Sequence, residues 1–151
     1  MKRRFVSCCL LLAMVVSMLS TGVSAEGNNN QIIHFDDGSY MIIFVEDISP
    51  RAVNTRVANK YYTYYDGSDN VEWEAKLNAS FTYDGTSATC TSANCTVTIY
   101  ESRWYEISNT TSRSGNTATT QLTMGEKFLG ITISKPQYTI TLTCDKDGNL
   151  S

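Results

Sequence analysis

The sequence predicts an all-β protein, an antiparallel β-sandwich of about seven to eight strands with an immunoglobulin-like arrangement. First, apolar and polar side chains alternate with a period of two over residues 71–83, the spacing of a strand with one buried face. Second, short stretches rich in Thr, Val, Ile and Tyr are separated by Gly, Asn and Asp at turn positions. Third, the chain has only two prolines and few stretches with helical spacing. A β-barrel is the alternative architecture.

The first predicted elements are two strands, residues 31–35 and 40–45, joined by a turn at residues 36–39. Asp, Gly and Ser in that turn favour a hairpin. Residues 49–59 contain a proline and show no periodicity, so we expect a connector there. Residues 60–65 are rich in tyrosine and predict a short aromatic strand.

The long strand over residues 71–83 places Trp73 and Phe81 on its buried face, where we expect them to anchor the core. Glu72 and Glu74 fall on the opposite face, which the alternation predicts to be solvated. Turns are expected at residues 66–70 and 84–87, and further strands at residues 95–100, 117–124, 128–134 and 137–144, with residues 104–107 continuing the first of these or following a bulge.

The N-terminus has the three parts of a secretory signal peptide in residues 1–25. Three basic residues precede an apolar run, and small residues then frame a cleavage site after Ala25. The apolar run is shorter than the roughly 20 residues that a membrane span needs; an uncleaved anchor is the alternative. We therefore expect a secreted protein. Residues 26–59 are predicted to be a polar leader, an N-terminal hairpin and a connector, and residues 60–151 the main β-sandwich domain.

Removal of the signal peptide leaves an acidic chain. The sequence has 12 Lys and Arg and 15 Asp and Glu; without the three basic residues of the signal peptide, nine remain against 15, a net charge of −6. Nucleic acids and anionic membranes are bound by clustered Lys and Arg. The composition therefore argues against nucleic acid and, after cleavage, against a membrane as the partner. Subtracting 25 residues from 151 leaves 126, which fits a single hydrophobic core.

Three cysteines lie outside the signal peptide: Cys90, Cys95 and Cys144. In an oxidising compartment two of them are expected to pair. A Cys90–Cys144 disulfide closes a loop of roughly 55 residues and stabilises by about 4 kcal/mol through chain entropy, whereas the short Cys90–Cys95 loop gives about 2 kcal/mol. We favour Cys90–Cys144 and keep Cys90–Cys95 as the alternative. No metal or other cofactor is expected, because three thiols lack a fourth zinc ligand.

Four clustered tyrosines are the predicted ligand-binding residues: Tyr61, Tyr62, Tyr64 and Tyr65. In a strand, Tyr61 and Tyr65 share one face while Tyr62 and Tyr64 share the other, so one pair is expected to be exposed. Exposed aromatic rings stack on sugar rings or anchor a protein partner. Ordinary cross-strand pairing is the alternative interpretation.

The signals for catalysis are weak. Glycoside hydrolysis uses two carboxylates, and Glu72 and Glu74 share a strand face, but on a wet face we expect a solvated pair. His34 is the single histidine and lies in a predicted strand, where a structural role is expected. We therefore assign no catalytic residue.

Three stretches carry a resemblance to known proteins. They are residues 73–90 (W-E-A-K-L-N-A-S-F-T-Y-D-G-T-S-A-T-C), residues 114–118 (S-G-N-T-A) and residues 142–151 (L-T-C-D-K-D-G-N-L-S). With these stretches, the chain resembles a group of uncharacterised small secreted proteins from Gram-positive, Clostridia-like bacteria over residues 60–151. The resemblance implies export and the first of the two cysteine pairings. The group has no assigned activity, so it implies no catalytic residue.

These features predict a secreted, non-enzymatic β-sandwich that binds a glycan, a cell-wall polymer or an extracellular protein. A secreted hydrolase with an unrecognised carboxylate site is one alternative, and it predicts activity that depends on Glu72 or Glu74. A toxin-like or inhibitory effector is the other. Fold class alone does not separate these functions, because β-sandwiches host all of them.

Overall fold

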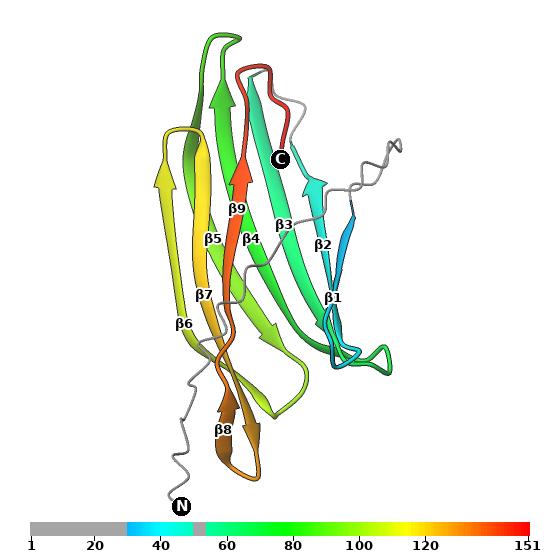
Figure 1. The fold of residues 1–151 in the computed structure, drawn as a ribbon. Helices are drawn as coiled ribbons and strands as arrows, with labels where there is room; N and C mark the ends of the chain where they lie inside the picture. Colours follow the sequence, from blue (N-terminus) through cyan, green and yellow to red (C-terminus); the bar gives the residue numbers. More distant parts are fainter. Residues whose placement is uncertain (1–29, 50–53) are drawn as a thin grey trace, which may run out of the picture.

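The computed structural model describes residues 30–49 and 54–151, in which two antiparallel sheets pack face to face around a common core (Figure 1). This architecture confirms the predicted antiparallel β-sandwich. The expected signal peptide lies outside the described residues. The strands are β1 (Gln31–His34), β2 (Tyr40–Asp47), β3 (Thr55–Tyr65), β4 (Val71–Tyr83), β5 (Ala88–Ile99), β6 (Trp104–Ser114), β7 (Thr117–Phe128), β8 (Ile131–Ser134) and β9 (Gln137–Thr143).

The strand order follows the chain. One sheet runs β1-β2-β3-β4-β5, and the other runs β6-β7-β8, with β9 also paired to β7. β8 and β9 pair with successive parts of β7, and Pro136 lies between them. An immunoglobulin fold instead alternates consecutive strands between its sheets through Greek-key connections. The immunoglobulin-like part of the prediction is therefore not confirmed: neighbouring segments pair as meanders.

The core lies between β4 and the facing strands of the smaller sheet. From β4, Trp73, Leu77 and Phe81 are completely buried. Leu122 of β7 and Leu142 of β9 are buried from the opposite sheet. The alternation in the sequence thus identified the correct inner face of β4, and the expected core anchors Trp73 and Phe81 are confirmed.

Two strands begin earlier than the sequence predicts. β3 begins at Thr55, so residues 55–59 belong to a strand and not to the expected connector. β5 begins at Ala88 rather than at Cys95. Polar side chains interrupt the apolar alternation in both extensions, so the sequence pattern did not reveal them. The backbone of each extension is nevertheless hydrogen-bonded to the neighbouring strands. Among the described residues, no helix is long and apolar enough to cross a membrane.

Aspartates organise the tight turns. Asp37, Asp66, Asp84 and Asp145 each accept a hydrogen bond on Oδ1 from the backbone N–H two residues later, at 2.8–3.0 Å. This arrangement reverses the chain locally. At Asp84, the hydroxyl of Thr86 donates a further hydrogen bond, and these bonds lower the pKa of Asp84 to about 2. The turns predicted ahead of β2, β4 and β5 are thereby confirmed.

The predicted disulfide is absent from the described residues, in which Cys90, Cys95 and Cys144 are free, buried thiols. Cys90 and Cys95 lie along one strand, where about 3.3 Å per residue takes them beyond the roughly 7 Å between Cα atoms that a disulfide spans. Cys90 N–H donates to Gly115 O (2.8 Å), and Cys144 N–H donates to Asn116 O (3.1 Å). The backbone of the β6–β7 turn therefore separates these two cysteines.

We expect the native protein to resist thiol reagents. Burial raises the pKa of each of the three thiols, so little thiolate is present at neutral pH and the reagent cannot reach it. Titration of protein that begins at Glu26 should detect almost no reactive thiol before denaturation and three per chain afterwards. A single thiol after denaturation would instead show that two cysteines had paired, as the sequence predicts.

Candidate ligand-binding surface

The four predicted tyrosines divide between the two faces of β3. Tyr62 and Tyr64 face the core and are half-buried. The ring of Tyr64 stacks on Trp73 with 5.6 Å between ring centroids, and its hydroxyl donates to Ser39 Oγ at 2.8 Å. These contacts give Tyr62 and Tyr64 a role in packing. Tyr61 and Tyr65 therefore remain as the candidates for contacting a ligand.

Two stacked aromatic pairs lie on the outer face of the larger sheet. Tyr61 stacks on Phe44 with ring centroids 4.5 Å apart, and Tyr65 stacks on Tyr40 at 4.8 Å. Both pairs join residues directly opposite each other on β2 and β3. His34 of β1 extends the second pair, with its ring 5.8 Å from that of Tyr40. Since Tyr61 and Tyr65 are four residues apart on one strand, the pairs lie roughly 13 Å from each other.

A polar row crosses the sheet beside the first pair. Glu46, Asn59, Asn78 and Asn94 occupy matching positions on four adjacent strands. Asn78 Nδ2 donates to Asn59 Oδ1 (2.8 Å), and Asn59 Nδ2 donates to Glu46 Oε2 (3.1 Å). The Tyr61 hydroxyl donates to the same Glu46 oxygen at 2.9 Å. These hydrogen bonds lower the pKa of Glu46 and hold the row in a defined conformation.

We define the outer platform as these side chains on the exterior of the larger sheet. It combines partly exposed aromatic rings, amide groups and one carboxylate on the outer face of the sheet, with Asn59 buried among them. The sequence predicted all four tyrosines as ligand-binding residues, Tyr61 and Tyr65 among them, but not the residues that pair with them on β2. The alternation within β2, which places Tyr40, Phe44 and Glu46 on one face, was the signal that could have found them. The platform consists of Tyr40, Phe44, Glu46, Asn59, Tyr61, Tyr65, Asn78 and Asn94.

The two carboxylates of β4, Glu72 and Glu74, have different environments in the structure. Glu74 is partly exposed and accepts a hydrogen bond from Thr63 Oγ1 at 3.2 Å. Glu72 is only 2% exposed, which corrects the prediction of a solvated pair. Its Oε2 accepts hydrogen bonds from Arg103 Nε and Trp104 Nε1, both at 2.7 Å. The turn between β5 and β6 covers this carboxylate, so Glu72 is held as a structural group.

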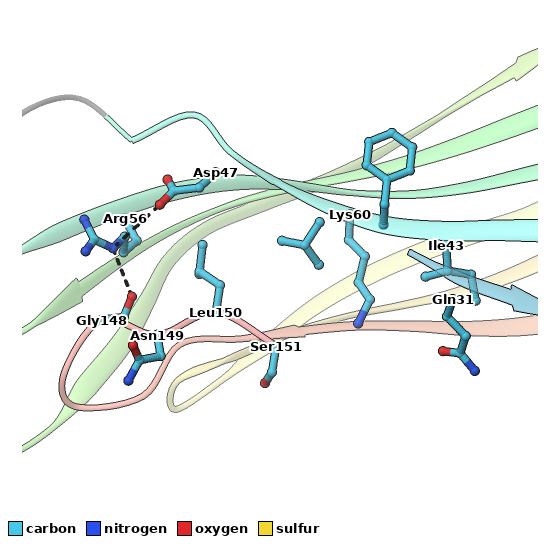
Figure 2. Close-up of a pocket in the computed structure, with 11 residues that line it drawn as sticks. Gln31, Ile43, Asp47, Arg56, Lys60, Gly148, Asn149, Leu150 and Ser151 are labelled. Atoms are coloured by element: carbon cyan, nitrogen blue, oxygen red, sulfur yellow. Dashed lines mark hydrogen bonds and ion pairs between the residues drawn. The ribbon is translucent and has the colours of Figure 1, made fainter. Parts of the chain in front are cut away.

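A groove of about 570 Å³ lies between β2, β3 and the segment that follows β9 (Figure 2). Lys60 Nζ donates to Thr141 O at 2.8 Å, and Arg56 Nε donates to Gly148 O at 2.9 Å. Arg56 also lies 3.9 Å from Asp47 Oδ2. These contacts tether β9 and the segment that follows it to β3. Among the described residues, no group of three or more His, Cys, Asp and Glu side chains is placed to hold a metal ion.

We expect Gly148→Ala to destabilise the protein by about 1–3 kcal/mol. Gly148 has a φ of +86°, and a Cβ there would lie 2.6 Å from Cζ of Tyr83. Gly85→Ala is the matched control, since Gly85 has a similar φ of +84° but a Cβ there meets nothing within 4 Å. Urea denaturation should separate the two variants; equal midpoints would contradict the packing of Tyr83 on Gly148.

Comparison with known proteins does not assign this chain to a family. No family model matches the chain, and no curated protein matches it. A crystal structure of a hypothetical protein from Listeria monocytogenes EGD-e is similar, with a TM-score of 0.48 and 17% sequence identity, covering 86% of this chain and 96% of that one.

Proposed function

We propose that this protein is a secreted, non-enzymatic binding module that takes a glycan or cell-wall polymer on the outer platform. The observation that carries the proposal is the two stacked aromatic pairs, Phe44 with Tyr61 and Tyr40 with Tyr65, partly exposed on one outer face. Aromatic rings offer flat apolar surface for the C–H faces of sugars, and tyrosine adds a hydroxyl for hydrogen bonding.

The polar row supports the same class of ligand. Amide groups donate and accept hydrogen bonds, as sugar hydroxyls do, so a row of asparagines is suited to polyhydroxylated chains. Asn59 is buried and orients its neighbours: it accepts a hydrogen bond from Asn78 and donates one to Glu46, which lowers the entropy that Asn78 and Glu46 lose on binding. An open face also fits an extended polymer better than a small molecule, since small-molecule sites are concave.

The test is a pull-down of protein beginning at Glu26 on peptidoglycan, mucin and insoluble polysaccharides. We expect saturable binding to one of these, weakened about tenfold or more in Tyr61→Ala/Tyr65→Ala through the loss of two aromatic contacts. Tyr100→Ala is the matched control, because Tyr100 is exposed but lies outside the platform. Circular dichroism should confirm that both variants fold.

Two outcomes would contradict the proposal. If the double variant binds as tightly as the wild type, the platform is not the binding surface. If no polymer is retained, the polymer ligand is wrong, and an extracellular protein becomes the partner to seek. Release of soluble fragments from any of these polymers would favour the hydrolase alternative.

A further inference from the structure

The hairpin between β7 and β8 exposes an unusual amount of apolar surface. It projects past the end of the smaller sheet, at the bottom of Figure 1. Four of its side chains are largely open to solvent: Phe128 (64%), Leu129 (86%), Ile131 (70%) and Ile133 (59%). We call these four residues the apolar tip. Soluble proteins scatter single apolar side chains on their surfaces, whereas a contiguous cluster marks a site of interaction.

In β8 the polar side chains face the protein and the apolar side chains face the solvent. Thr132 and Ser134 are the less exposed residues of the strand, while Ile131 and Ile133 are exposed. The hydroxyls of Thr132 and Tyr105 are hydrogen-bonded to each other at 2.7 Å. A strand that only packed on its own core would show the reverse pattern. Packing within this chain therefore does not account for the isoleucines.

Leu129 is also an unfavourable residue for the turn in which it lies. Phe128 and Ile131 are opposite each other, so Leu129 and Gly130 form a two-residue loop. Both have positive φ angles, 50° at Leu129 and 80° at Gly130. Such loops favour Asn-Gly or Asp-Gly, because branched apolar residues rarely adopt this conformation. The leucine costs stability in the turn and places an apolar side chain at its most exposed point.

Cationic groups flank the apolar tip. Lys127 precedes it on β7 and Lys135 follows it after β8, and both are exposed. Lys127 Nζ lies 4.4 Å above the ring of Tyr105, and its backbone N–H donates to Arg103 O at 2.8 Å. Arg103 is paired with the carboxylates of Glu72 (2.7 Å) and Glu126 (3.9 Å). Lys127 and Lys135 are therefore the cationic groups that flank the apolar tip without an ion pair among the described residues.

We propose that this hairpin inserts its apolar tip into the interface of an anionic lipid bilayer. Apolar side chains enter the acyl boundary while flanking lysines stay among the anionic headgroups. The projecting shape suits a bilayer, since the turn and the exposed face that carries Ile131 and Ile133 can be buried without a matching cleft. The inference goes beyond the proposed polymer binding and uses a different part of the molecule. It also departs from the expectation of no membrane partner, because the net charge of the whole chain does not describe the two exposed lysines that flank the apolar tip.

The test is co-sedimentation with vesicles of phosphatidylcholine and phosphatidylglycerol, compared with phosphatidylcholine alone. We expect binding to the anionic vesicles, reduced about tenfold or more in Leu129→Asn/Ile131→Thr. Asparagine suits the turn better than leucine, so this variant keeps the fold while removing the apolar contact. Ile48→Ser is the control: Ile48 is exposed and directly follows β2, and the C-terminal end of β2 lies far from the β7–β8 hairpin (Figure 1). Lys127→Gln and Lys135→Gln should each weaken the preference for anionic vesicles by about fivefold.

A fluorescence measurement distinguishes insertion from adhesion. Trp73 and Trp104 are buried, so a Leu129→Trp variant adds a solvent-exposed reporter. Its emission should shift to the blue only with anionic vesicles. Absence of vesicle binding, an unshifted reporter, or equal binding by Leu129→Asn/Ile131→Thr would overturn the proposal. A concentration-dependent dimer that is lost in that variant, without vesicle binding, would identify a second copy as the occupant instead.

Discussion

Replacing Glu72 with alanine is expected to lower the free energy of unfolding by about 3 kcal/mol. The Glu72 carboxylate is buried and accepts hydrogen bonds from Arg103 Nε and Trp104 Nε1. Without it, the indole N–H of the buried Trp104 loses its partner. Arg103 keeps about half of its side chain in solvent, which limits the loss on that side of the ion pair.

Two matched variants test the origin of that effect. Glu72→Gln retains an acceptor and removes only the charge, so we expect a loss of about 1–2 kcal/mol. Glu74→Ala removes a carboxylate from the same strand but from a partly exposed position, and should cost about 0.5 kcal/mol. Urea denaturation of the three proteins provides the comparison. Equal stability of Glu72→Ala and Glu74→Ala would contradict a structural role for Glu72.

Trp73→Ala is expected to be the most destabilising single change, at about 3–5 kcal/mol. Trp73 is completely buried on β4 and packs against rings from both sheets. Its ring centroid lies 5.6 Å from that of Tyr64, 6.1 Å from Trp104 and 5.2 Å from Tyr138. Truncation removes this contact surface and leaves a cavity that the surrounding strands cannot close.

Trp73→Phe is the informative companion variant. Among the described residues, Trp73 Nε1 is a buried side-chain nitrogen without a hydrogen-bond partner. Phenylalanine removes that unpaired donor while keeping one aromatic ring, so the expected loss is about 1–2 kcal/mol. Thermal and urea denaturation should rank the wild type first, Trp73→Phe second and Trp73→Ala last. A loss in Trp73→Phe as large as in Trp73→Ala would contradict this ranking, since it would mean that one retained ring restores none of the packing of the indole.

Only part of the arrangement of the four tyrosines of β3 could be predicted from the sequence. Alternation correctly separated Tyr61 and Tyr65 from Tyr62 and Tyr64, because side-chain direction in a strand depends only on the residues next to it. It could not say which pair faces outward. That choice depends on Phe44, Tyr40 and Trp73, which reach the tyrosines through pairing between distant segments.

Local patterns by themselves determined the all-β class, the buried face of β4 and the aspartate-led turns, because these features depend on contacts within a few residues. Only the tertiary structure decided the sequential order of the strands, the separation of the cysteines, the burial of Glu72 and the outward direction of the isoleucines of β8. Each of those depends on which distant segment lies beside a residue. Period-two alternation does not specify that segment, because it determines the face of the strand on which each side chain lies but not which strands lie beside it.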